Sequence, residues 1–214
     1  MGVLIIGDVH GCFHTLKSLI KENWDSATDQ LVLVGDLINK GPHSVKTWRY
    51  CLKLMEDFPQ QVIILRGNHE HWFIKQHRRK NSSKQFKELI AAFERKNLSA
   101  DEISRQFGAL PLHWENRELY VSHAGLSEAC EDPFDLNKAH NLTVNRKKLK
   151  PLAKVQICGH QILAGNKPLF KASENAWHID TGAWCNGILS ALYFDTDSRK
   201  PRIIRQKRHV KDEL

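Results

Sequence analysis

Six side chains suited to metal coordination recur along the chain, each within two residues of a glycine. They are Asp8, His10, Asp36, Asn68, His123 and His160. Carboxylate and amide oxygens mixed with imidazole nitrogens favour manganese, iron, zinc or magnesium over copper or an iron–sulfur cluster. Six ligands are more than one tetrahedral zinc ion requires, so they predict two metal ions about 3.5–4 Å apart that share one carboxylate. Such a pair lowers the pKa of a bridging water and holds the oxygens of a phosphoryl group during in-line attack.

These side chains follow short apolar runs. The runs are Val3–Ile6, Leu31–Val34, Val62–Leu65, Leu119–Val121 and Val155–Cys158. Short runs of this kind that end at a glycine or a polar residue predict buried strands. Between them, Phe13–Glu22 and Ser44–Asp57 carry apolar residues at helical spacing. The alternation predicts an α/β fold whose site lies beyond the carboxyl ends of the strands, which is where the six side chains fall.

The segment at about 71–107 has a different character, polar, basic and helical in pattern. Ser99 followed by Glu102 has the spacing of a capping box, which predicts the start of a further short helix. We therefore expect a helical insertion over one edge of the sheet.

Near the C-terminus the hydrophobic period changes again. Ser190–Phe194 and Arg202–Arg205, joined through Asp195–Pro201, predict a β-hairpin. The sequence has no internal repeat and no linker rich in Gly, Ser or Pro, so we expect a single domain over residues 1–214.

Composition limits the class of protein. With 214 residues, 41% of them hydrophobic and 26% charged, the chain is typical of a globular protein and excludes a collagen or a disordered tail. No apolar run approaches the ~18–20 residues that span a bilayer, and we see no signal peptide, so we expect no membrane association. Five scattered cysteines without a CxxC pair predict reduced thiols and a cytoplasmic protein. Lys211-Asp212-Glu213-Leu214 has the letters of an endoplasmic-reticulum retrieval signal, which we interpret as chance.

The net charge of +8 predicts attraction to anions such as nucleotides, nucleic acid or phosphorylated proteins, although a solvated basic surface would have the same charge. Arg78-Arg79-Lys80, close to Trp72 and Phe73, keeps open a protein that binds nucleic acid or a nucleotide without catalysis. The same basic block could also steer an acidic substrate toward the metals.

Five motifs carry a family resemblance. They are Gly7-Asp8-Val9-His10-Gly11, Gly35-Asp36-Leu37-Ile38-Asn39-Lys40-Gly41-Pro42, Gly67-Asn68-His69-Glu70, His123-Ala124-Gly125 and Gly159-His160. In this order they resemble the calcineurin-like metallophosphoesterases, and within these the phosphoprotein phosphatase superfamily, which includes serine/threonine phosphatases and symmetrical diadenosine-tetraphosphate hydrolases. The resemblance implies a β-sandwich flanked by helices and a hydrolase of phosphate esters or anhydrides. It also implies two divalent metal ions, manganese first, with iron, zinc, nickel or magnesium as alternatives.

The resemblance assigns the metal ligands and the catalytic groups. One metal takes Asp8, His10 and Asp36, and the other takes Asp36, Asn68, His123 and His160, so that Asp36 bridges them. His69 matches the catalytic histidine that protonates the leaving oxygen or supports the attacked phosphate, and Arg66 matches a phosphate-binding arginine. Arg146, in Asn145-Arg146, matches a second such arginine on two residues only. His178 matches no ligand position, and we expect a structural role for it.

Asn39 and Lys40 stand where protein phosphatases of the superfamily carry Asp-Arg. Because Asn39 supplies no charge, it should hold a proton on His69 less strongly, and Lys40 lacks the two-pronged grip of arginine on phosphate. A nucleotide phosphate is a better leaving group than a serine alkoxide and needs less general-acid help. We therefore expect dinucleoside polyphosphates such as diadenosine tetraphosphate as substrates, with phosphoproteins as the alternative, since Glu70 matches the protein-phosphatase form of its motif.

Overall fold

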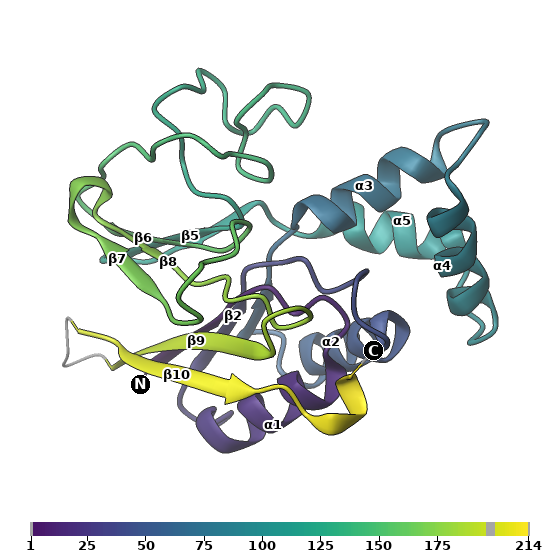
Figure 1. Ribbon diagram of the computed structural model, residues 1–214, viewed down its shortest axis with the longest axis horizontal. Coiled ribbons are helices and arrows are strands. Elements are labelled where there is room, and N and C mark those ends of the chain that lie inside the picture. The colour runs from purple at the N-terminus through teal and green to yellow at the C-terminus, as the bar shows by residue number, and fades with distance from the viewer. Residues whose placement is uncertain (1, 196–199, 214) are drawn as a thin grey trace.

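Two five-stranded sheets form the centre of the computed structural model, which describes residues 2–195 and 200–213 (Figure 1). The first sheet has the order β10-β9-β1-β2-β3 and the second the order β4-β5-β6-β8-β7. The strands of the first are β1 (Gly2–Ile6), β2 (Gln30–Leu33), β3 (Val62–Ile64), β9 (Ile188–Asp195) and β10 (Arg202–Lys207). Those of the second are β4 (His113–Glu115), β5 (Leu119–Ser122), β6 (Val155–Cys158), β7 (Leu169–Lys171) and β8 (Ala176–His178). The α/β fold and the sandwich of sheets are thus confirmed.

Each sheet has a parallel centre. In the first, β1 pairs with β2 and β2 with β3 in parallel, and in the second β5, β6 and β8 do the same. Parallel strands end on the same edge of their sheet, so the loops that follow β1, β2 and β3 meet, as do those that follow β5 and β6. The five predicted apolar runs all lie in these strands or overlap them by all but one residue.

The parallel strands β1 and β2 of the first sheet are buried on both faces. Ile5 of β1 belongs to the apolar cluster between the sheets, together with Val121 of β5 and Ile157 of β6. Its neighbours Leu4 and Ile6 point the other way, into the cluster beneath the helices α1 (Phe13–Asn23) and α2 (Ser44–Asp57). Burial on both faces explains why these strands read as continuous apolar runs rather than as alternating ones.

Three helices form a block beside the sheets: α3 (Asn68–His77), α4 (Lys84–Glu94) and α5 (Ala100–Ala109) (Figure 1). The ring of Phe73 packs edge-to-face on Phe86 and Phe107, with ring centroids 4.9 and 5.3 Å apart. The helical insertion predicted over 71–107 is therefore present, but its first helix begins at Asn68. The cause is a Glu70 carboxylate that accepts the backbone N–H of Gly67 at 3.0 Å and so caps the helix three residues before the predicted start.

The hairpin predicted near the C-terminus is present as the antiparallel pair β9 and β10. Most of its connection, predicted over Asp195–Pro201, lies outside the described residues. Strands β4, β7 and β8 were not predicted, because each has only three residues and no apolar run, and all three residues of β7 are exposed.

The C-terminal turn η2 (Val210–Asp212) packs on the start of α1. The Asp212 carboxylate is 1% exposed and accepts the backbone N–H groups of His14 at 3.1 Å and Thr15 at 2.7 Å, and the Thr15 hydroxyl at 2.7 Å. Cys12, the residue before α1, makes no side-chain cap of its own. A residue almost 200 positions away therefore caps this helix. Among the described residues, no helix is both long enough and apolar enough to cross a membrane.

Candidate metal centre

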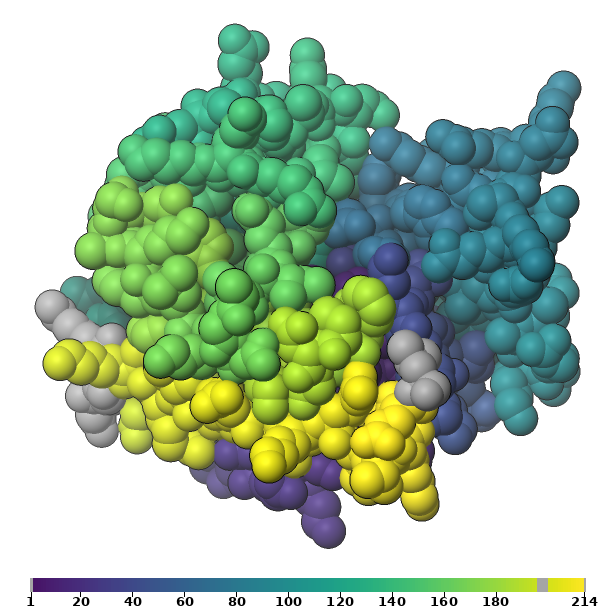
Figure 2. Space-filling view, in the orientation of Figure 1, coloured from purple at the N-terminus to yellow at the C-terminus, as the bar shows by residue number. Residues whose placement is uncertain are grey.

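The loops after five strands deliver the six predicted ligands to one place. Asp8 and His10 follow β1, Asp36 follows β2, and Asn68 opens α3 after β3. From the second sheet, His123 follows β5 and His160 follows β6. In Figure 2 the surface is hollowed between the green loop region and the blue helical block, with purple N-terminal residues in its depth.

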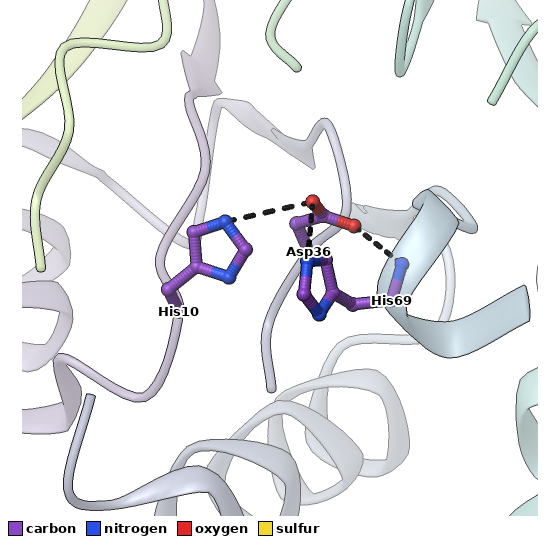
Figure 3. Close-up of side chains that lie close together, drawn as sticks. All are labelled: His10, Asp36 and His69. Carbon is purple, nitrogen blue, oxygen red and sulfur yellow. Dashed lines mark hydrogen bonds and ion pairs between the residues drawn. The ribbon is translucent and has the colours of Figure 1, made fainter. Parts of the chain in front are cut away.

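The Asp36 carboxylate lies at the centre of this cluster. Its Oδ2 is 3.5 Å from His10 Nε2, 3.5 Å from His123 Nε2 and 4.0 Å from His69 Nε2. Figure 3 shows His10 and His69 reaching it from two sides. Burial alone would raise the pKa of Asp36, but the facing histidines His123, His10 and His69 lower it to about 2, so the group is a carboxylate at neutral pH.

Two of these histidines are oriented by backbone carbonyls. His10 Nδ1 donates to the carbonyl of Ile38 at 3.1 Å, and His123 Nδ1 donates to the carbonyl of Val34 at 3.0 Å. A carbonyl can only accept, so in each neutral ring Nδ1 carries the proton and Nε2 is an acceptor. Both Nε2 atoms then face an oxygen of Asp36 that is also an acceptor. A cation between them would satisfy all three atoms, and the carbonyl–histidine arrangement is the usual support of a metal-binding imidazole.

A second convergence lies on Asn68. Its Oδ1 is 3.0 Å from His123 Nε2 and 2.8 Å from His160 Nδ1. The ligand atoms of Asp36, His123 and His160 lie within 4.8 Å of one another, and so do those of His10, Asp36 and His69. The two groups share Asp36, as expected for two adjacent metal ions, but the first contains His69 where the sequence predicts Asp8.

Asp8 is buried in the same region but is placed differently. Its two oxygens accept the backbone N–H of His160 at 3.2 and 3.1 Å, and it is not a member of either of the two close groups among the described residues. Burial, then the neighbouring carboxylates Asp180 and Asp36, raise its pKa well above the usual range. A divalent cation would relieve this accumulation of carboxylates.

Asp180 was missed as a site residue by sequence reasoning. It is 2% exposed and follows β8 in the turn Asp180-Thr181-Gly182, where it accepts the backbone N–H of Gly182 at 2.9 Å. The same signal that found the other ligands, a polar residue at a strand end near a glycine, was available for it.

Two glycines let the backbone approach the carboxylates. A Cβ on Gly67 would lie 2.2 Å from Asp36 Oδ1, and a Cβ on Gly159 would lie 1.9 Å from Asp8 Oδ1. Both distances are far shorter than any real carbon–oxygen contact, so only glycine fits.

The backbone of the centre is also strained. Left-handed φ values between 45° and 69° occur at His10, Asp36, Asn39, Lys40 and His160, none of which is glycine. Such conformations cost free energy and concentrate at functional sites.

Glu70 holds the two loops that carry Asp36 and Asn68 together. It is fully buried, and its carboxylate accepts the backbone N–H groups of Asp36 at 2.9 Å, Leu37 at 2.9 Å and Gly67 at 3.0 Å. Burial and then Asp36 raise its pKa to about 7, while the three N–H bonds oppose that rise. In the sequence, Glu70 only indicated the protein-phosphatase form of its motif, and its role in joining the two loops was not predicted.

His69 lies beside the cluster with its partner Asn39. Asn39 Nδ2 donates to His69 Nδ1 at 2.9 Å, and the backbone N–H of His69 donates to Asp36 Oδ1 at 2.8 Å. Burial lowers the pKa of His69 to about 4, although Asp36 opposes the shift, so the ring is neutral at pH 7 and carries its proton on Nε2. Lys40 is exposed, and its Nζ lies 5.4 Å from the ring centroid of Trp184.

The two predicted arginines differ in their contacts with this centre. Arg66 donates to the carbonyl of Gly108, and to that of Leu110 at 3.1 Å; among the described residues no hydrogen bond or ion pair joins it to the cluster. Arg146 is exposed but close to His160, whose pKa falls to about 3 because of burial and His123, with Arg146 adding to the shift.

His178 and Cys158 form a separate pair. His178 Nε2 lies 2.8 Å from a carboxylate oxygen of Glu174, and its Nδ1 lies 3.5 Å from the sulfur of Cys158. Burial raises the pKa of the Cys158 thiol, so the group is protonated and unreactive at neutral pH.

Comparison with known proteins agrees with this geometry. The family model described as calcineurin-like phosphoesterase matches residues 1–186. The chain belongs to this family. It is 35% identical over 130 residues to a symmetrical bis(5'-nucleosyl)-tetraphosphatase of Hamiltonella defensa. This match covers 59% of this chain and 45% of that protein. A protein of the same name from Colwellia psychrerythraea is 30% identical over 155 residues, covering 65% and 52%.

The chain therefore spans about half the length of these curated relatives of the family. A solved protein serine/threonine phosphatase of Saccharomyces cerevisiae has the same fold, with a TM-score of 0.68 and 15% identity over 97% of this chain and 80% of that one. At this identity the likeness concerns the fold alone.

Proposed function

We propose that this chain is a metal-dependent phosphohydrolase that works with two divalent ions, manganese first and iron, zinc, nickel or magnesium as alternatives. The observation that carries the proposal is the Asp36 oxygen with an unprotonated histidine nitrogen 3.5 Å away on each of two sides. Asp8, His10 and Asp36 would hold one ion, and Asp36, Asn68, His123 and His160 the other. When bound, the ions polarise the phosphoryl group and lower the pKa of the attacking water.

The surrounding residues position the substrate and supply hydrogen bonds. Because Asn39 donates to Nδ1 of His69, the remaining proton of the ring is on Nε2, on the side that faces Asp36. From there the neutral His69 would donate a hydrogen bond to an oxygen of the phosphoryl group or of the leaving group. Lys40 would attract phosphate as a point charge, and Arg66 and Arg146 would assist from the rim of the centre.

The leading substrate class is the dinucleoside polyphosphates. The two curated relatives named above are tetraphosphatases, and a neutral Asn39 suits a leaving group that needs little help from an acid. The alternative is a protein phosphatase, which Glu70 supports because it matches that form of the motif. The third hypothesis is a protein that binds nucleic acid without catalysis, and an RNA affinity that falls steeply with added salt would support it.

The test is kcat/KM of the manganese-loaded protein on diadenosine tetraphosphate and on a phosphothreonine peptide, side by side. We expect the dinucleotide to be preferred by more than about a hundredfold, which corresponds to about 3 kcal/mol of transition-state stabilisation. A preference for the peptide would overturn the substrate class, and no turnover of either with metal bound would overturn the hydrolase itself.

A double variant examines the reason given for this preference. Asn39→Asp with Lys40→Arg restores the Asp-Arg pair of protein phosphatases, which should favour the poorer leaving group. We expect the ratio of peptide to dinucleotide activity to rise at least about tenfold. If the ratio does not move, the leaving-group argument is wrong.

We also propose that the protein works in a reducing compartment, the cytoplasm, and that residues 1–214 form a single domain. The five cysteines, all unpaired, support the first. Treatment with a chelator should abolish activity, and return of each candidate metal in turn should identify the one that restores it best.

A further inference from the structure

A basic recess lies between α3, α5 and the loop around Leu136. It has a volume of about 430 Å³, and its charged lining consists of Arg66, Lys75, Arg78 and Arg105, with no acidic side chain among the residues that line it. This volume is within the range of sites for small molecules.

Two of its residues have buried nitrogen atoms without a partner. Both ring nitrogens of His71 and Nε of Arg66 are buried, and none of them makes a hydrogen bond among the described residues. A neutral imidazole carries a proton on one nitrogen, so His71 and Arg66 each present an unsatisfied N–H group here. Buried donors without partners are rare in folded proteins, and a ligand with acceptor oxygens would satisfy them.

The positive charge of the recess is only partly compensated. Arg105 pairs with Glu102, and Arg66 donates to two backbone carbonyls. Lys75 and Arg78 have no acidic partner in the part of the chain that the structure describes. Burial, then the charges of Lys75, Arg66 and Arg78, lower the pKa of His71 to about 4, because all three cations lie near this one ring.

We propose that this recess binds phosphate groups of the substrate beyond the one that is cleaved. The inference rests on the proposed function and names what the helical insertion contributes to it. Arg66 lies directly before Gly67 and Asn68, so the recess adjoins the metal centre along the chain. Acceptor oxygens of a polyphosphate chain would pair with Lys75 and Arg78 and take hydrogen bonds from His71 and Arg66.

A polyphosphate fits the recess better than the backbone of a nucleic acid does. Proteins that bind single strands combine positive charge with exposed aromatic rings on which bases stack. The nearby aromatics are already used: Phe73 is fully buried in the core, and the ring of Trp72 packs on Phe86 with centroids 5.8 Å apart.

The experiment compares two double variants of the same helix end. Lys75→Ala with Arg78→Ala removes the two unpaired cations of the recess, while Arg79→Ala with Lys80→Ala removes the same charge from exposed positions that do not line it. Two readouts are measured: the Kd of inorganic tripolyphosphate by calorimetry, and kcat/KM on diadenosine tetraphosphate and on p-nitrophenyl phosphate, which carries a single phosphate.

We expect the first variant to weaken tripolyphosphate binding and to lower kcat/KM on the dinucleotide by about tenfold or more, with p-nitrophenyl phosphate unaffected. The second variant should change each value less than about twofold. Equal effects of the two variants would overturn the proposal, since they would reflect net charge alone. Lys75- and Arg78-dependent binding of a single-stranded oligonucleotide but not of tripolyphosphate would also overturn it.

The two proposals fail separately. If the protein does not hydrolyse diadenosine tetraphosphate, the proposed substrate is wrong, yet selective loss of tripolyphosphate binding in the first variant would still support the recess. If hydrolysis is normal and the variants behave alike, the recess proposal fails and the proposed function stands.

Discussion

Removal of the Asp212 side chain should destabilise the protein far more than its place near the end of the chain suggests. Its carboxylate accepts three hydrogen bonds at the start of α1, two of them from Thr15, a fully buried residue. In Asp212→Ala both Thr15 donors lose this acceptor away from water. An unsatisfied buried donor costs ~1–3 kcal/mol and the loss of a helix cap costs ~0.5–2 kcal/mol. Because these costs overlap, we expect a loss of about 2–4 kcal/mol.

Asp212→Asn should lose less, about 1 kcal/mol, because its amide oxygen can still accept from Thr15 while its NH2 group faces the partly exposed N–H of His14. The matched control is Glu213→Ala, which removes the same charge from an exposed neighbour and should stay within about 0.5 kcal/mol of the parent.

The assay is equilibrium unfolding in urea, followed by tryptophan fluorescence, with melting temperatures as a second readout. A loss of 2–4 kcal/mol corresponds to a fall in Tm of roughly 5–15 °C for a chain of this size. If Asp212→Ala and Glu213→Ala unfold at the same urea concentration, the cap contributes nothing and the reasoning is refuted.

Two further results follow from the structure. Gly159→Ala should displace the Asp8 carboxylate and reduce metal binding, because the new Cβ would lie 1.9 Å from Asp8 Oδ1. The control Gly165→Ala, whose Cβ meets nothing within 4 Å, should bind metal like the parent. Equal metal contents of the two variants would contradict the packing argument. The lowered pKa of His71, about 4 against 6.5 in the unfolded chain, means that the unfolded state binds a proton first. The free energy of unfolding should therefore fall as the pH drops from about 6.5 to 4, and it should fall less in His71→Gln. Urea unfolding of both proteins at several pH values measures this difference. Parallel curves for the two proteins would show that His71 is not responsible.

The sequence predicted those elements that a local run of residues determines. Apolar runs such as Val62–Leu65 identified the buried strands, because a strand buried on both faces has no polar positions. The ligands could be predicted because each follows such a run closely. The carboxyl ends of parallel strands meet at one sheet edge, so these side chains were expected to lie together.

The residues that sequence reasoning missed act through contacts between distant segments. Glu70 joins the loops after β2 and β3, and Asp212 caps α1 from the other end of the chain. Neither role has a local pattern. Arg66 stays a predicted phosphate-binding residue, but its contacts were not foreseen: its guanidinium donates to carbonyls at the end of α5, a helix that the motif itself does not contain.

The most direct test of the metal centre is its manganese content, measured by mass spectrometry after gel filtration. The parent protein should bind two ions per chain, and Asp36→Asn should bind neither firmly, because both groups of ligands share this carboxylate. Asp29→Asn is the control, since it changes a buried carboxylate at the opposite end of β2 and should keep two ions. One ion or none in the parent, or two in Asp36→Asn, would contradict a centre bridged by Asp36.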